Sequence, residues 1–193
     1  MKRVLLLIML AAAVFSVNAQ VLSEDSAATI VKEKGVFEQK KVVYVDSVKA
    51  STLYRRAMEA LSDWTGTDGR SRAGLDYCDK EEGLVTYKGE FYNGYRKLLL
   101  GTLPFYTDFT LKVRCKDGRA QVIVTVPTMH TVLNNGKKRT WTVREIVDAQ
   151  ESTTKKAKEK AKNKTNAISM REVVNLLLEN MESALKQDKD EDF

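Results

Sequence analysis

The chain has 193 residues, of which 43% are hydrophobic and 30% charged, with 32 basic side chains against 26 acidic ones. This length suits one domain of typical size with extensions. If Lys2 and Arg3 are removed with a signal peptide, the formal net charge falls from +6 to +4, a surplus that calls for no nucleic-acid partner.

Residues 1–19 have the pattern of a secretory signal peptide. Lys2 and Arg3 precede an apolar run over residues 4–15, and Val17 and Ala19 supply the small residues that a signal peptidase reads. The alternative, a membrane anchor, needs about 20 apolar residues. We therefore expect export, with cleavage after Ala19, to the periplasm or the medium. No cysteine stands immediately after the cleavage site, so a lipoprotein is disfavoured, and no other segment is expected to span a membrane.

The next segments predict the start of an α+β domain over residues 36–150, after a flexible leader over residues 20–35. Residues 37–45 are a candidate strand. Residues 47–64 then predict an amphipathic helix, since Leu53, Ala57 and Leu61 fall on one face. The same spacing predicts that Arg56 faces water. Residues 65–74 are expected to form a connecting loop.

Two further strands are predicted over residues 75–79 and 84–93, around a turn at residues 80–83. The pair Asn93-Gly94 is a second turn signal, because this dipeptide favours the tight turns of hairpins.

The most legible segment is FTLKVRCKDGRAQVIVTV, residues 109–126, which predicts a hairpin with a two-residue turn at Asp117-Gly118. The predicted apolar pairs are Cys115 with Ala120, Val113 with Val122, Leu111 with Val124 and Phe109 with Val126. The polar side carries Thr110, Lys112, Arg114, Lys116 and Gln121. An antiparallel sheet with one dry face and one wet face explains these polar residues without a function. They are nevertheless the candidate binding residues if any surface of the sheet binds a partner.

Beyond Pro127 the sequence predicts one more hairpin, with its turn at residues 134–136. Residues 151–167 are a lysine-rich linker without large apolar side chains; attraction to an anionic surface is the alternative role. Residues 168–186 predict a closing amphipathic helix that either docks on the sheet or pairs with another chain. Residues 187–193 are an acidic tail.

The two cysteines, Cys78 and Cys115, are candidates for a disulfide in an exported protein. The alternative is two separate thiols that act as small hydrophobic side chains. A bridge requires Cα atoms about 4.4–6.8 Å apart, and the sequence leaves that geometry open.

Catalytic and metal-binding motifs are absent from the sequence. His130 is the only histidine, and a general base needs partners, so we interpret it as a structural or surface residue. There is no HExxH, paired CxxC or GxSxG motif. No metal, cofactor or enzymatic activity is expected. One alternative stays open: the carboxylates Asp76, Asp79, Glu81 and Glu82 gather near a turn and could serve a hydrolase if a cleft held two of them at a defined separation.

Three stretches together resemble a known family: LYRRAMEALSDW at residues 53–64, EEGLVTYKGEF at residues 81–91, and the hairpin over residues 109–126. They are similar to domain of unknown function 4468, which is described as having a TATA-binding-protein-like fold and occurs in exported proteins of Bacteroides-type bacteria. The similar region runs from Phe37 to Trp141. The resemblance implies an α+β antiparallel sheet with amphipathic helices on one face and the other face open. It implies no activity and no catalytic residues.

The sequence therefore favours an exported, non-enzymatic envelope protein that binds a partner, a protein or a glycan, through the open face of its sheet. A carboxylate-dependent hydrolase of an envelope substrate is the alternative. Nucleic acid is not an expected partner, because fold does not imply function and an exported protein meets little of it.

Overall fold

The computed structural model describes residues 28–31, 35–62, 69–98, 101–133, 135–146 and 168–187. The predicted signal peptide, the lysine-rich linker and nearly all of the acidic tail lie outside these residues. The strands are β1 (Ala28–Val31), β2 (Val36–Tyr44), β3 (Arg72–Asp79), β4 (Leu84–Leu98), β5 (Gly101–Lys116), β6 (Arg119–Val132) and β7 (Lys138–Thr142). The helices are α2 (Ala50–Ala60) and α5 (Met170–Lys186).

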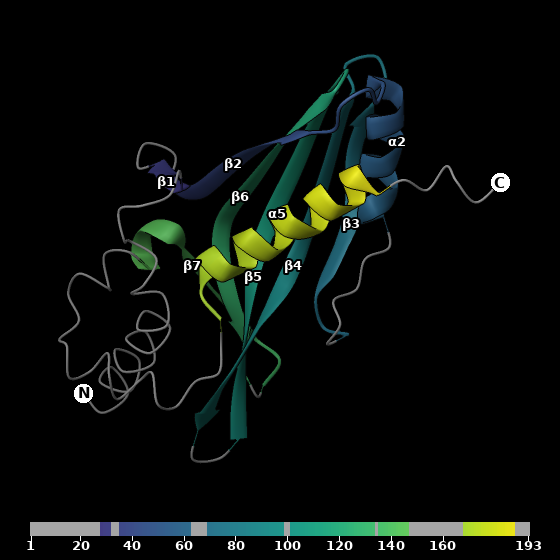
Figure 1. The fold of residues 1–193 in the computed structure, drawn as a ribbon. Helices are drawn as coiled ribbons and strands as arrows, with labels where there is room; N and C mark the ends of the chain where they lie inside the picture. The colour runs from purple at the N-terminus through teal and green to yellow at the C-terminus, as the bar shows by residue number, and fades with distance from the viewer. Residues whose placement is uncertain are drawn as a thin grey trace.

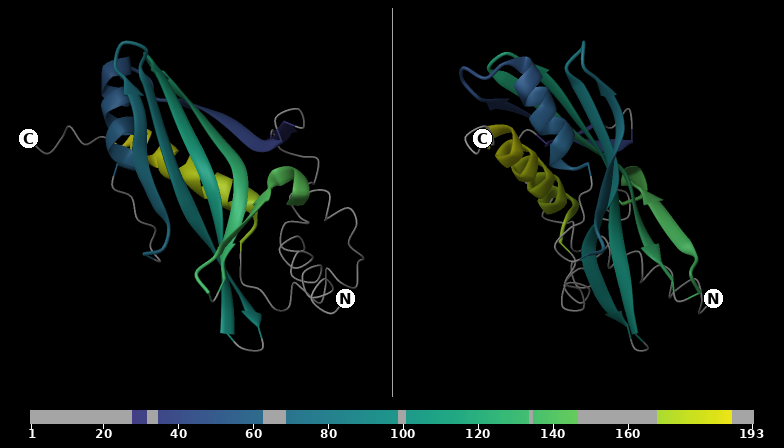
Figure 2. Two further views of the ribbon diagram at one scale, coloured as in Figure 1. Left: turned by 180° about the vertical axis from the view of Figure 1, so that it is seen from behind. Right: turned by 90° about the vertical axis from the view of Figure 1, so that its right-hand side faces the viewer.

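All strands pair antiparallel in one sheet with the order β1-β2-β6-β5-β4-β3, and β7 pairs with the end of β6 beyond β2. Both helices lie on the same side of this sheet, and α5 runs obliquely across it (Figures 1 and 2). Neither α2 nor α5 covers the opposite face. This arrangement confirms the predicted α+β fold with helices on one face.

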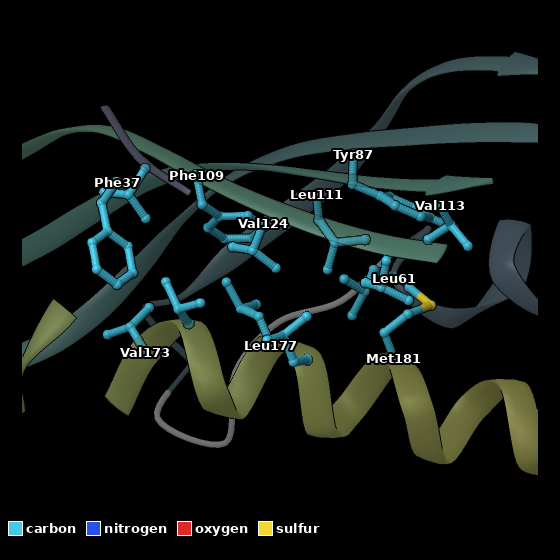
Figure 3. Close-up of a cluster of buried hydrophobic side chains, with 14 of the residues drawn as sticks. Phe37, Leu61, Tyr87, Phe109, Leu111, Val113, Val124, Val173, Leu177 and Met181 are labelled. Carbon is cyan, nitrogen blue, oxygen red and sulfur yellow. The ribbon is translucent and has the colours of Figure 1, made fainter. Parts of the chain in front are cut away.

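The core lies between the sheet and α5 (Figure 3). Alternate residues of β5 and β6 point into it, and α5 contributes Val173, Leu177 and Met181, which are fully buried. The closing helix therefore docks on the sheet of its own chain, which is the first of its two predicted roles. Its start is also well defined, because Ser169 and Glu172 form a capping box.

The predicted register of the central hairpin is confirmed from Lys116–Arg119 to Thr110–Thr125. The predicted pair of Phe109 with Val126 is wrong. The next pair after Thr110–Thr125 is Asp108–Thr128, so β6 contributes one residue more than β5 and forms a bulge at Val126 and Pro127. Proline suits this position because it has no N–H to donate to the ladder.

Two local expectations are also wrong. Asn93-Gly94 forms no turn, because β4 runs straight through it with a register shift between Tyr92 and Gly94. The Asn93 side chain accepts a hydrogen bond from the Thr107 hydroxyl at 2.8 Å and donates one to the Ile168 carbonyl oxygen at 3.3 Å. The amide is thus used across the core rather than in a turn.

The expected leader contains β1, which adds to the edge of β2 through backbone pairing.

Arg56 was expected to face water, but it is only 5% exposed. Its Nη1 donates to the Leu185 carbonyl oxygen at 3.0 Å, in the last turn of α5. The α2 helix therefore meets both the sheet and a second helix, and the carbonyl end of α5 is a favourable place for a cation.

The disulfide between Cys78 and Cys115 is not formed. Both are free thiols, Cys78 exposed and Cys115 buried. Cys78 on β3 pairs with Val85 on β4, which pairs with Val113 on β5. Two strand spacings separate Cys78 from Val113 by about 9.5 Å, and Cys115 lies two residues farther along β5. The two cysteines are therefore beyond the reach of a bridge. Burial raises the pKa of the Cys115 thiol to about 12.

Candidate functional site

The left view of Figure 2 looks onto the face of the sheet away from the helices. The predicted binding residues lie on this face, because they alternate with the buried residues of β5 and β6. At the end of this face near the Asp117-Gly118 turn, six side chains surround a hollow of about 280 Å³. They are Val42, Tyr44, Arg114, Lys116, Arg119 and Gln121. We call this hollow the basic hollow.

The structure brings three of the five predicted residues into the basic hollow: Arg114, Lys116 and Gln121. Arg114 pairs with Gln121 and Lys116 with Arg119 across the hairpin, which explains their shared place. Thr110 and Lys112 lie farther along the same face and are half-buried. The binding role of all five stays a prediction.

Three residues of the hollow were missed by sequence reasoning: Val42, Tyr44 and Arg119. Val42 faces Gln121 and Tyr44 faces Arg119 in the pairing of β2 with β6. That pairing joins segments about 80 residues apart, so no local pattern indicated it. Arg119 lies within the quoted hairpin and was available from the predicted Lys116–Arg119 pair.

The basic hollow combines positive charge with exposed apolar surface. Arg114, Lys116 and Arg119 form no ion pair within 4.0 Å among the described residues. Tyr44 is 64% exposed and Val42 is 42% exposed, so apolar surface lies directly beside the cations. A surface of this kind attracts anionic groups and offers an aromatic ring for additional contact.

The acidic residues behind the hydrolase alternative have local structural roles. The Asp79 carboxylate accepts hydrogen bonds from the backbone N–H groups of Glu81 and Glu82, at 2.9 and 3.0 Å, and from the Tyr77 hydroxyl. The bond from the N–H of Glu82, the largest contribution, lowers the pKa of Asp79. Asp76 pairs with Lys88 at 3.0 Å. These carboxylates hold the β3–β4 turn and edge.

A second group of polar side chains lies on the same face at its other end. Glu90 on β4 and Asp108 on β5 are direct cross-strand neighbours, and His130 on β6 contacts both. His130 Nδ1 lies 3.0 Å from Asp108 Oδ1, and Nε2 lies 3.4 Å from Glu90 Oε2. We call these three residues the histidine cluster.

The surroundings of Asp108 stabilise its charged form. Burial acts to raise the pKa of Asp108, but the hydrogen bonds from His130 and Thr128 and the charges of His130 and Lys138 outweigh it, so this pKa lies below its ordinary value. The Thr128 hydroxyl donates at 2.6 Å. The His130 ring also stacks on Tyr106, with centroids 5.0 Å apart and planes 12° apart.

Sequence reasoning missed the histidine cluster because it ended the hairpin strand at Val126 and treated His130 as a lone histidine of a separate hairpin. In the structure β6 continues past Pro127, and the bulge there places His130 on the open face, opposite Tyr106. Pro127 was the one local signal that could have indicated the bulge, because proline in a sheet favours such irregular positions.

Comparisons with solved structures identify proteins with a similar fold. A DUF4468 protein from Bacteroides ovatus ATCC 8483 is 13% identical, with a TM-score of 0.55 over 86% of this chain and 94% of that one. A TBP-like protein from Parabacteroides distasonis ATCC 8503 is 16% identical, with a TM-score of 0.52 over 80% of this chain and 96% of that one. At these identities the likeness shows the fold alone. A comparison with curated proteins finds no match.

Among the described residues no helix has the length and hydrophobicity to cross a membrane. The family profile for the domain of unknown function DUF4468 with TBP-like fold matches residues 40–129, from β2 to β6. This segment holds most of both groups of polar side chains on the open face. The chain thus carries a DUF4468 segment, residues 40–129, and its fold is similar to the TBP-like fold of a solved DUF4468 protein.

Proposed function

We propose that this protein is an exported binding module that recognises an anionic group of an envelope protein or glycan through the basic hollow. The observation that carries the proposal is the hollow itself: three cations without ion pairs among the described residues, beside an exposed tyrosine. Export is supported by the signal-peptide pattern of residues 1–19.

The physical argument is one of electrostatics and geometry. The guanidinium groups of Arg114 and Arg119 present planar, fork-like donors that match carboxylate, sulfate or phosphate oxygens. Arg114 on β5 and Arg119 on β6 lie on strands that pair with each other without interruption from Lys116–Arg119 to Thr110–Thr125, and β6 also pairs with β2. The backbone that carries these side chains is therefore held rigidly, which lowers the entropic cost of binding.

Photo-crosslinking in the native cell envelope tests the proposal. A photoreactive residue at Tyr44, on the hollow, should give a specific product that mass spectrometry identifies. The matched control is a probe at Arg55, which is 44% exposed on α2 on the other side of the sheet. Arg56 would be a poor control, because it is buried.

Charge-removing variants test the role of the cations. In purified components, Arg114→Gln and Arg119→Gln should each weaken binding about tenfold or more, since a hydrogen bond to a charged group contributes about 1.5–3 kcal/mol. Lys40→Gln is the control, because Lys40 is an exposed cation already paired with Glu38. Equal crosslinking from Tyr44 and Arg55, or binding that survives both arginine changes, would refute the proposal.

Export is tested separately. Sequencing the N-terminus of the protein isolated from the envelope should show that it begins at Gln20.

A further inference from the structure

The histidine cluster has an arrangement that simple sheet packing does not explain. Glu90 and Asp108 stand directly opposite each other on adjacent strands. Like charges in such a pair repel and destabilise the sheet. A cation between them removes that cost.

His130 is placed between the two carboxylates and is almost completely buried, with 2% of its side chain exposed. The oxygens of Glu90 and Asp108 and a ring nitrogen of His130 all lie within 4.8 Å of one another. One imidazole nitrogen and nearby carboxylate oxygens form a mixed donor set that suits zinc-class divalent metals.

The distances agree with metal coordination. Zinc binds histidine nitrogen and carboxylate oxygen at about 2.0–2.2 Å, so the donor atoms of a tetrahedral site lie about 3.3 Å apart. His130 Nε2 and Glu90 Oε2 are 3.4 Å apart. On the other side of the ring, Nδ1 donates to Asp108, and this is the contact that usually fixes the orientation and tautomer of a metal-binding histidine.

We propose that the histidine cluster is a binding site for a divalent transition metal of the zinc class. His130 Nε2 and the Glu90 carboxylate are the ligands, and Asp108 orients the ring. Water completes the coordination. The ion replaces the Lys138 ammonium, which lies 3.8 Å from Glu90 and 4.0 Å from Asp108.

The metal can reach this site from solvent. The carboxylate side chains of Glu90 and Asp108 are 35% and 27% exposed. Both also line an open depression of about 370 Å³ that extends toward Arg72 on β3 and Lys88 on β4. The buried histidine supplies a fixed ligand, and the two carboxylates connect it to the surface.

The experiment is a titration of tag-free protein with ZnCl₂ in a Cys78→Ser background, since Cys78 is an exposed thiol that binds zinc by itself. His130 is the only histidine of the chain, so the imidazole C2–H resonance in proton NMR reports on this residue alone. A saturable shift of this resonance is expected, and calorimetry then measures the affinity.

Substitutions separate the three roles. His130→Gln and Glu90→Gln should abolish the saturable binding, and Asp108→Asn should weaken it about 10–100-fold, as expected for a group that orients a ligand. Lys138→Met should strengthen binding because it removes a competing cation. Lys112→Met removes the same charge farther along the same face and should leave the affinity unchanged. Circular dichroism confirms that each variant is folded.

Three results would overturn the assignment. The first is a His130 resonance that stays unmoved in millimolar zinc, and the second is zinc affinity that survives His130→Gln. The third is equal competition by Ca²⁺ against Zn²⁺, which would make the site one of carboxylates alone. An affinity that rises equally in Lys138→Met and Lys112→Met would also contradict the displacement of Lys138.

Discussion

Gly89 is a position at which the pairing of β3 with β4 is sensitive to a single methyl group. A Cβ at this position would lie 2.2 Å from the Arg72 carbonyl oxygen and 2.9 Å from the Ala73 Cα, both in the backbone of β3. It would also lie 2.8 Å from Cζ of Phe109. Side-chain rotation relieves only the last contact, so Gly89→Ala must push β3 away from β4. We expect the free energy of unfolding to fall by about 2–4 kcal/mol, from overpacking and from ladder hydrogen bonds worth about 1 kcal/mol each.

Gly74→Ala is the matched control. Gly74 lies on β3 beside the residue that pairs with Gly89, and a Cβ there would meet nothing within 4 Å. The free energy of unfolding of Gly74→Ala should stay within about 1 kcal/mol of that of the natural protein, since the change mainly restricts the unfolded chain. Urea denaturation measures both variants, and hydrogen exchange should locate the loss of protection at the start of β3. Equal stability of Gly89→Ala and Gly74→Ala would refute the close approach of the two strands.

Three further outcomes follow from the structure. A thiol reagent at pH 8 should modify Cys78 alone in the native protein and Cys115 only after unfolding, because Cys115 is buried and its pKa is about 12; two native reactive thiols would contradict this. Asn93→Ala should cost about 2–3 kcal/mol in urea denaturation by leaving the buried Thr107 hydroxyl without its acceptor, and adding Thr107→Val should recover part of it. Burial raises the pKa of Tyr87 to about 12 from 10.0. The unfolded chain therefore loses this proton first, and stability should fall between about pH 10 and 12; a flat profile there would contradict the shift.

The sequence predicted the centre of the fold well because local rules agree there. The Asp117-Gly118 turn sets the hairpin register, and the alternation of Val113 and Leu111 with charged residues sets the buried face. The closing helix was equally predictable, since the apolar residues at helical spacing are the ones that the structure buries from Val174 to Leu185.

The wrong predictions have two causes. In some strands one extra residue switches the face of the sheet on which the following side chains lie. Elsewhere a contact with a segment distant in sequence determines whether a side chain is buried. The bulges at Asn93 and Pro127 shift the register without a strong local signal, and both lie next to buried polar contacts. Arg56 is buried by α5, which lies about 130 residues farther along the chain. The pairing of β2 with β6 that completes the basic hollow is likewise a tertiary contact.

The bulge at Pro127 gives the open face two chemically different ends. Arg114 at the basic hollow and Asp108 in the histidine cluster are six residues apart on β5, which corresponds to about 20 Å. At physiological ionic strength charges are screened over about 8 Å, so a small anion at the hollow should bind equally with or without zinc. A long anionic ligand that lies along the whole face would approach the Glu90 and Asp108 carboxylates as well, and zinc would then reduce their repulsion. Binding of short and long anionic ligands, each with and without zinc, therefore separates a local site at the hollow from a surface that uses the full length of the sheet.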